Sequence, residues 1–312
     1  AALLGELVCD PVTYHGRFVP EYFESEKTNL LEAIRSLIND KRDWADSRLL
    51  RALCDGEAYA VPRLGDEETV DKLQALKVYT QYRDLISTAP LEIIYSGSAD
   101  LERVKQALAA AFATLPREEV RVISTAAPHV CRESVQHVED VLDVTQGKLG
   151  MGFSCGSDDV PALLMGNTLF GGSSNSKLFL NVREKLSLCY YASSLYHRQK
   201  GLITVSSGIE FQNYQRAYDE IMAQLEAVQK GELEDWELEG ARSTLLNSYA
   251  TVGDSQGKLE NFYLGQAATG QHETPADLAR AIQDMTAERI CRAMSTVKLD
   301  TVYFLKGKEA EA

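Results

Sequence analysis

The sequence lacks several features that would assign it to a common class at once. It has no C-x-x-C pair, and no apolar run reaches the roughly 18 residues that a membrane-spanning helix needs. It has five histidines, and no two of them are four residues apart. Its six cysteines are widely spaced, which is typical of free thiols in a reducing, cytoplasmic compartment. They are Cys9, Cys54, Cys131, Cys155, Cys189 and Cys291.

Basic residues are scarce relative to acidic ones. The chain has 32 Lys and Arg against 46 Asp and Glu, which gives a formal net charge of −14. Such a surface argues against a nucleic-acid backbone as partner and mildly favours basic ligands. A length of 312 residues predicts about two domains. No signal peptide and no initiator methionine open the chain, so we expect it to be part of a longer protein.

Apolar periodicity predicts an α+β organisation in two unequal parts. Up to Pro116, the pattern predicts helices over 21–53, 65–79 and 100–115 and a short strand over 91–95. Residues 117–134 mix charges, a proline and small residues, and they are expected to form a linker.

The part beyond the linker is predicted to be a complete α+β layer. Residues 147–153 alternate as a strand, and a helix is expected from about Val160. An antiparallel pair is expected within 196–208, with its turn at Lys200 and Gly201. A helix over 213–231, two more helices and a final strand over 301–305 complete this part.

The most informative segment runs from Leu169 to Ser194. The glycine pair 171–172 is expected to end one helix, because glycine adopts positive φ freely. The polar run 173–175 then offers N-cap side chains to an apolar-periodic helix. Arg183 falls near the end of that helix, and Tyr190 falls on a following strand-like run. Spacing alone would fit a helix–turn–helix–strand corner of any α/β domain.

The residues of this segment resemble the second half of the pitrilysin-like metallopeptidases, the M16 or insulinase-like family. There, a GG-x-S/N-S-x-L-F stretch leads into R-E-K-x-x-L-x-Y. The Arg and the Tyr of that motif project into a closed proteolytic chamber and help to hold the substrate. The resemblance therefore implies that Arg183 and Tyr190 bind substrate. The matching residues are Gly171, Gly172, Ser176, Leu178, Phe179, Arg183, Glu184, Lys185, Leu188 and Tyr190.

The resemblance also implies a domain organisation. Pitrilysin-like subunits contain two similar α+β halves, each an antiparallel sheet covered by helices, joined by a linker. On this basis, residues 1–116 are the C-terminal part of a truncated first half. Residues 117–134 are the linker, and residues 135–312 are a complete second half.

The family's zinc motif, H-x-x-E-H, is absent from the sequence. The third zinc ligand of the family, a Glu seven residues after the position of Glu26, is replaced by Ala33. Glu32 lies one residue early, and one residue rotates a helical side chain by about 100°, away from the metal. A one-residue shift in the alignment would restore Glu32 as a ligand.

No other pattern in the sequence predicts a metal site. A loose cluster near the linker matches no known zinc spacing, and its histidines are expected to be surface or hydrogen-bonded side chains. No zinc is therefore expected in this chain, only in an active partner or a missing segment. The cluster consists of His129, Cys131, His137 and Glu139.

Two further motifs resemble a non-catalytic subset of the family. The pattern F-x-x-E-K-x-x-L occurs at 23–30 and is followed by Asn39-Asp40-Lys41. This combination is similar to that of the YmfF-like members, which are found beside an active partner.

Three functions remain open from the sequence. The first is a non-catalytic M16 subunit that binds peptide in a chamber shared with a zinc-bearing partner, as a homo- or hetero-dimer. The second is an excised C-terminal fragment of an active zinc metalloendopeptidase whose H-x-x-E-H lies upstream of residue 1. The third is an interaction module with no role in peptide binding. In each case the chain alone is not expected to be catalytic, and neither nucleic acid nor a membrane is expected as partner.

Overall fold

The computed structural model describes residues 1–121 and 127–308 of the chain. These residues fold into two compact units. Unit 1 is formed by residues 1–37 and 63–124, and unit 2 by residues 38–62 and 125–312. The segment 38–62, which precedes the predicted linker 117–134, is thus part of unit 2. Residues 122–126 of that linker lie outside the described part of the chain.

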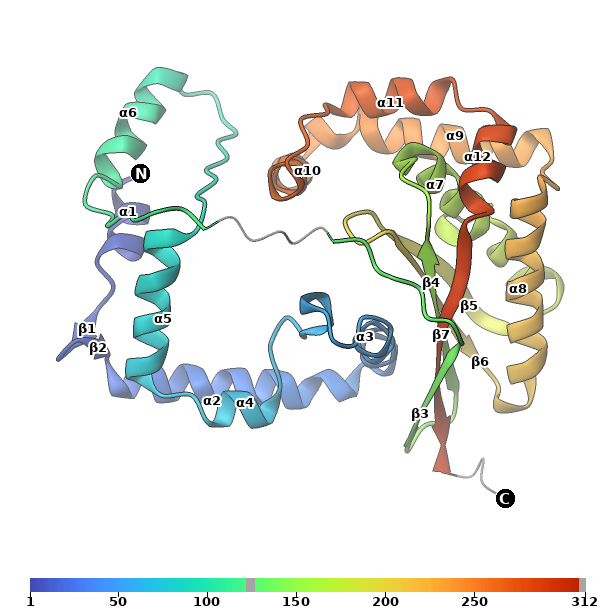
Figure 1. The fold of residues 1–312 in the computed structure, drawn as a ribbon, viewed down its shortest axis with the longest axis horizontal. Coiled ribbons are helices and arrows are strands. Elements are labelled where there is room, and N and C mark those ends of the chain that lie inside the picture. The colour runs from blue at the N-terminus through green and yellow to red at the C-terminus, as the bar shows by residue number, and fades with distance from the viewer. Residues whose placement is uncertain (122–126, 309–312) are drawn as a thin grey trace. The chain divides into compact units, whose positions relative to one another are not determined.

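Unit 1 is mainly helical (Figure 1). Asp100 caps α6 through a hydrogen bond from the Arg103 N–H to its carboxylate (2.9 Å), as the sequence predicts. The helix expected over 65–79 is instead divided between α4 and α5. The elements are α1 (Ala2–Cys9), β1 (Thr13–Tyr14), β2 (Arg17–Phe18), α2 (Pro20–Ser36), α4 (Glu67–Asp71), α5 (Ala75–Thr88) and α6 (Leu101–Ala111).

The strand expected over 91–95 is not present, so that prediction is wrong for this structure. The segment has no regular secondary structure, and four of its side chains are between 37% and 49% exposed. A strand needs a neighbour to pair with its backbone groups. In the described residues of unit 1, the sheet consists of the hairpin β1–β2, which does not pair with this segment. The four side chains are Leu91, Ile93, Ile94 and Tyr95.

Unit 2 is built on a five-stranded sheet in the order β3-β7-β4-β6-β5. β3 and β7 are parallel and all other neighbours are antiparallel, so the sheet is mixed and not antiparallel as expected. The difference comes from β3, which the sequence pattern did not reveal. The strands are β3 (Gln136–Leu142), β4 (Gly147–Cys155), β5 (Cys189–His197), β6 (Leu202–Ile209) and β7 (Val297–Gly307).

Helices cover one face of this sheet and form the main core with it (Figure 1). Gly231 ends α8 in the left-handed conformation, with φ at 77°, as predicted. Four helices follow α8 where two were expected, because caps at Thr274 and Thr286 start two short additional helices. The helices are α7 (Val160–Asn167), α8 (Tyr214–Lys230), α9 (Asp235–Ala250), α10 (Gln256–Thr269), α11 (Pro275–Gln283) and α12 (Ala287–Met294).

The helix α3 (Lys41–Leu53) packs on the opposite face of the sheet. Asp40 caps it by accepting hydrogen bonds from the N–H groups of the first turn. Leu49 and Leu53, both at most 1% exposed, lie over Gly150 and Gly152 of β4. A Cβ on Gly152 would come within 2.7 Å of Leu53 Cδ2, so the absent side chains allow the close approach of α3.

Candidate substrate-binding site

A cavity of about 410 Å³ lies at the start of β5, and both substrate-binding residues predicted from the sequence line it. The cavity is formed by the end of the helical turn η4 (Leu178–Lys185), the beginning of β5 and the segment after β6. Its lining residues are Arg183, Glu184, Ser187, Leu188, Cys189, Tyr190, Glu210 and Asn213.

Arg183 is placed by a helix with π-type hydrogen bonding. The fully buried Leu178 and Val182 fix η4 to the core, and Arg183 follows directly on the solvent side. The Arg183 guanidinium lies 4.7 Å from the centre of the Phe179 ring and 3.6 Å from the Glu184 carboxylate. Both contacts are local and the side chain remains 40% exposed, so the guanidinium is available to a ligand in the cavity.

A tight turn connects Arg183 to β5. Ser187 adopts a positive φ of 50°, which is uncommon for a residue with a side chain. Its N–H donates to the Arg183 carbonyl (3.1 Å), and the Leu188 N–H donates to the Val182 carbonyl (3.0 Å). These bonds satisfy two carbonyl groups in the last turn of η4 and hold the backbone of Arg183.

Tyr190 lies at an irregularity in the edge strand β5. Cys189 pairs with Ile209 and Tyr191 with Gly208, so Tyr190 is the extra residue of a β-bulge. Bulges redirect side chains, and the Tyr190 side chain is 59% exposed. Within the described sheet, no strand pairs with the outer edge of β5. The bulge therefore places a phenol hydroxyl beside an unpaired strand edge.

The glycine pair before η4 ends a helical stretch, as predicted, but without the positive φ that was expected. Gly171 and Gly172 belong to a π-helical turn, η3 (Thr168–Gly172), and neither has a positive φ. A Cβ on Gly171 would lie 2.8 Å from the backbone nitrogen of Ser194 in β5. The glycine is thus needed for close packing of η3 on β5, and the expectation of a positive φ is wrong. The polar run 173–175 also does not cap η4, whose N-cap residue is Lys177.

The chemistry of the cavity suits binding. It contains one guanidinium, two carboxylates, a phenol and an amide. Burial raises the pKa of the Cys189 thiol, with a nearby serine hydroxyl and Arg183 acting in the opposite direction, so this cysteine is a poor nucleophile.

The described residues do not fit the family's catalytic zinc. That zinc needs a pair of histidines. Among the described residues, one set of histidine, cysteine and acidic side chains is close enough to hold a metal, and it contains one histidine. The loose sequence cluster near the linker does not form such a set as a whole, and His137 and Glu139 are exposed on β3. Glu32 is exposed on α2 and belongs to no such set.

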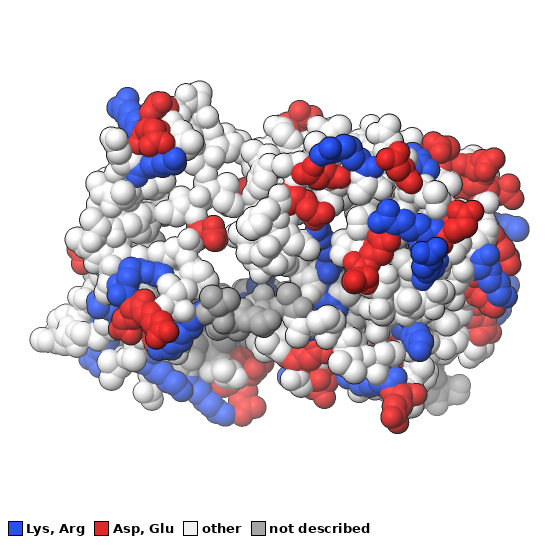
Figure 2. Space-filling model, turned by 45° about the horizontal axis from the view of Figure 1, so that its top comes forward, with Lys and Arg blue, Asp and Glu red and all other residues white. Residues whose placement is uncertain are grey.

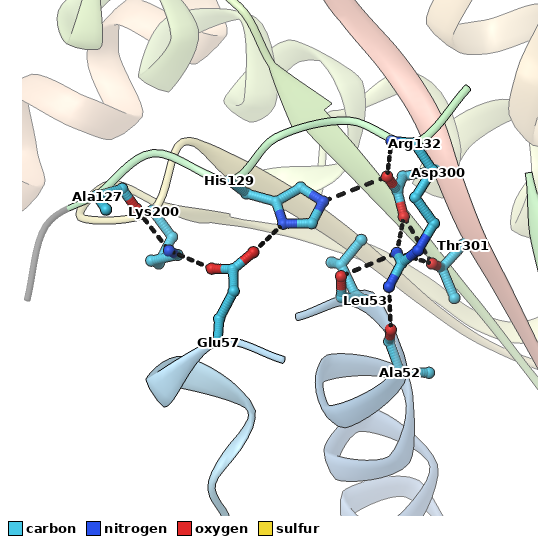
Figure 3. A network of polar contacts seen from close by, with 9 residues as sticks. All are labelled: Ala52, Leu53, Glu57, Ala127, His129, Arg132, Lys200, Asp300 and Thr301. Carbon is cyan, nitrogen blue, oxygen red and sulfur yellow. Dashed lines mark hydrogen bonds and ion pairs between the residues drawn. The ribbon is translucent and has the colours of Figure 1, made fainter. Parts of the chain in front are cut away.

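A polar network that sequence reasoning missed connects α3, the segment 127–132 and β7 in unit 2 (Figure 3). Asp300, whose side chain is fully buried, accepts hydrogen bonds from the Arg132 N–H (2.8 Å) and the Arg132 guanidinium. His129 lies between Asp300 and Glu57. Lys200 forms an ion pair with Glu57. Asp300 does not stand out in the sequence, because β7 also contains Lys298, Thr301 and Lys306.

Comparison with known proteins places this chain in a family. A sequence profile described as the peptidase M16 inactive domain matches residues 72–245. The chain belongs to the M16 peptidase family. It is 35% identical over 314 residues to a Bacillus subtilis protein described as probable inactive metalloprotease YmfF, covering 98% of this chain and 72% of that protein. The M16 chain is thus a homologue of a probable inactive metalloprotease.

Solved structures share the fold of this M16 chain. A conserved protein from Enterococcus faecalis V583 superposes with a TM-score of 0.86 and 25% identity, covering 98% of this chain and 73% of that one. A peptidase M16 inactive domain from Pseudomonas fluorescens has a TM-score of 0.79 and 17% identity, and the match covers 98% of this chain and 74% of that one. A more distant structure of this fold is the ferredoxin protease FusC in complex with Arabidopsis ferredoxin (TM-score 0.68, 13% identity, covering 98% and 34%).

Two surface properties accompany this assignment. In the described part of the M16 chain, no helix is both long enough and apolar enough to cross a bilayer. On the face drawn in Figure 2, acidic and basic side chains are interspersed. That face therefore offers no extended basic area of the kind that nucleic-acid phosphates require.

Proposed function

We propose that this M16 chain is a non-catalytic subunit that binds extended peptides beside β5, in a chamber shared with a zinc-bearing partner subunit. The observation that carries the proposal is the position of Arg183 and Tyr190. They are seven residues apart and line one cavity at the end of an unpaired strand edge. In this proposal the metal and the general base come from the partner.

The strand edge supplies the binding mode. An extended peptide can add to an exposed edge through main-chain hydrogen bonds, which give affinity with little demand on sequence. The Arg183 guanidinium would donate a hydrogen bond to a peptide carbonyl. The Tyr190 hydroxyl would donate one to the same region of the peptide. Because the chain carries a net charge of −14, basic peptides are the favoured ligands.

We also infer the organisation in two halves that the family resemblance implies. Residues 1–116 are assigned to the end of a first half, 117–134 to the linker and 135–312 to the second half. The apolar, exposed segment 91–95 supports this inference, because such a segment is suited to pair with strands of a first-half sheet. If segments encoded upstream supply that sheet, the amides of 91–95 become protected from hydrogen exchange when those segments are present.

Peptide affinity measured beside thermal stability tests the proposed site. The probe is a fluorescent, unstructured basic peptide of about 15 residues, with an acidic peptide of equal length for comparison. Loss of a charge-assisted bond costs about 1.5–3 kcal/mol, so Arg183→Ala should weaken binding roughly ten- to a hundred-fold. Tyr190→Phe removes one neutral hydrogen bond and should weaken binding up to about tenfold.

Matched controls separate binding from folding. Arg292→Ala removes an exposed arginine from α12, and Tyr263→Phe removes a hydroxyl from a partly exposed tyrosine on α10. Both should retain full affinity, and all four variants should melt at the temperature of the unmodified chain. Unchanged affinity in the Arg183 and Tyr190 variants, or losses matched by the controls, would contradict the proposal.

A further inference from the structure

We propose that Cys54, Glu57 and His129 bind one thiophilic divalent cation of the zinc type, at a site separate from the family's catalytic zinc. One ligand atom from each residue lies within 4.8 Å of the other two. The three residues and their neighbours all belong to unit 2. The proposal does not depend on peptide binding at β5.

A tight turn after α3 brings the first two ligands together. Cys54 is the C-cap residue of α3, and the Glu57 N–H donates to its carbonyl (2.9 Å). Gly56 within this turn has a positive φ of 83°, which glycine adopts without strain. The spacing C-x-x-E therefore places a thiol and a carboxylate on the same side of one turn.

The third ligand is held by a separate segment. The His129 N–H donates to the Lys200 carbonyl (3.1 Å), which fixes the backbone of 127–132 against the turn between β5 and β6. The His129 side chain is 4% exposed and projects between the two carboxylates, as Figure 3 shows. The fold of unit 2 thus holds all three ligands near one another.

Each ring nitrogen of His129 faces a carboxylate oxygen. Its Nδ1 lies 2.5 Å from Glu57 Oε1 and its Nε2 lies 3.2 Å from Asp300 Oδ2. A neutral imidazole has a single N–H and can donate to one of these carboxylates only. Either the ring carries two protons, or a metal replaces the proton between Nδ1 and Oε1. In the second case, Asp300 accepts from Nε2–H and orients the ring, as carboxylates do for metal-bound histidines.

The surrounding charges are compatible with a bound metal. Glu57 would ligate through Oε1, and its Oε2 would keep the ion pair with Lys200. Lys200 also donates to the Ala127 carbonyl, and Arg132 remains paired with Asp300. Metal binding therefore leaves the ion pairs of Lys200 and Arg132 in place and replaces the direct contact between His129 and Glu57.

The proton balance follows from the state of the thiol. Burial raises the pKa of Cys54 to about 11, so the metal-free thiol is protonated at neutral pH. Formation of the metal–sulfur bond releases that proton to solvent, together with the Nδ1 proton if the ring was doubly protonated. Affinity should consequently rise with pH, by about tenfold per unit for each proton released.

The donor set selects the metal. A thiolate, an imidazole and a carboxylate suit zinc or cobalt, whereas magnesium and calcium prefer oxygen ligands. The Nδ1–Oε1 distance must open by roughly 1 Å to reach tetrahedral bond lengths of about 2.0–2.3 Å. Three protein ligands leave a fourth position for water.

Cobalt binding to the full chain tests the site. The metal-free protein, prepared by dialysis against a chelator, is titrated with Co²⁺ alone and then with Zn²⁺ as competitor. We expect one metal per chain, a thiolate-to-cobalt charge-transfer band and its loss on addition of zinc. Bound zinc should also raise the melting temperature reversibly, since it binds the folded chain.

Two cysteine variants identify the ligand. Cys54→Ser should abolish the charge-transfer band and weaken zinc binding at least tenfold. Cys131→Ser is the matched control, because Cys131 lies two residues from His129 but outside the set. This variant should keep both the charge-transfer band and the zinc affinity. Glu57→Gln and His129→Gln, checked for folding by circular dichroism, should also lose affinity.

Several outcomes would overturn the proposal. One is the absence of stoichiometric binding at micromolar metal. Another is a charge-transfer band that survives in Cys54→Ser or disappears in Cys131→Ser. Tight binding that does not change between pH 6 and 8 would also contradict it, since ligation by Cys54 must release a proton.

Discussion

At the scale of single residues, the molecule uses glycine for close approach at the candidate site. Gly171 contacts β5 so closely that a Cβ would lie 2.7 Å from Ser194 Oγ and 2.8 Å from Ser194 N. The backbone atom cannot move away without displacing the strand that carries Tyr190. The geometry of the cavity therefore depends on a residue with no side chain.

Gly171→Ala should destabilise the protein by about 1–3 kcal/mol, the usual cost of overpacking a core. Gly240→Ala is the control, because Gly240 lies inside α9 and its added Cβ meets no atom closer than 3.9 Å. Alanine there should stabilise the helix by up to about 1 kcal/mol. Urea unfolding of both variants measures the difference, and equal stabilities would show that η3 and β5 adjust freely.

Some functional side chains could be predicted from the sequence and others could not. Arg183 and Tyr190 could be found because both belong to a dense motif. The network around Asp300 could not, because Glu57 and His129 are separated by 72 residues and His129 and Asp300 by 171. Hydrogen bonds of that kind depend on how distant segments pack, which no local pattern encodes.

At the scale of elements, α3 is held to the sheet by polar contacts as well as apolar packing. Arg48 Nε on α3 donates to the Asp140 carboxylate on β3 (2.8 Å), and the Tyr303 hydroxyl on β7 donates to the same carboxylate (2.8 Å). Burial tends to raise the pKa of Asp140, but the bonds from Arg48 and Tyr303 outweigh it and lower the pKa below its usual value. This carboxylate thus connects three elements.

Stability should depend on this group in acid. Because its pKa is lower in the folded state, Asp140 stabilises the fold above the unfolded pKa of about 4, and this contribution is lost as pH falls through the folded pKa. Asp140→Asn should lower the free energy of unfolding by about 1.5–3 kcal/mol at pH 7. Below pH 4, the variant should lose less stability than the unmodified chain does. Chemical unfolding from pH 7 to pH 3 checks both. An identical acid profile in the variant would rule out this role.

The same scale shows where element prediction fails. The start of α6, after the N-cap residue Asp100, and the end of α8, before Gly231, were predicted close to their observed positions. The segment 91–95 has the composition of a strand, but strand formation also requires a partner, which composition does not report. β3 was missed. It pairs with β7, which lies 150 or so residues later, because parallel strands need a long connection, and a local pattern does not report such a distant partner.

At the scale of the whole molecule, unit 2 is assembled from two separate stretches of chain. Residues 38–62 contribute α3, and residues 125–312 contribute the sheet and the helical layer. Sequence patterns group neighbours along the chain, so they indicated boundaries at 116 and 135. The burial of Leu49 and Leu53 beneath the sheet could be known only from the fold.

Cleavage within the predicted linker 117–134 should therefore leave the two fragments associated. α3 remains packed on the sheet after the chain is cut, and burial of each large apolar side chain stabilises this contact by about 1.5–3 kcal/mol. The fragments should elute together in native gel filtration and separate in urea. Independent elution of a stable 135–312 fragment under native conditions would contradict this expectation.

The discontinuous path of the chain has a consequence for synthesis on the ribosome. α3 is complete at residue 53, but β7, against which it packs, begins at residue 297. At about 5–20 residues per second, α3 waits on the order of 10–50 s before its partner strand emerges. During that interval β4 can cover only part of the apolar face of α3, and the cluster that Ala45 and Leu49 form with Tyr303 and Leu305 cannot yet assemble. The nascent chain should accordingly be most exposed to chaperones and to aggregation late in translation, just before its last strand is made.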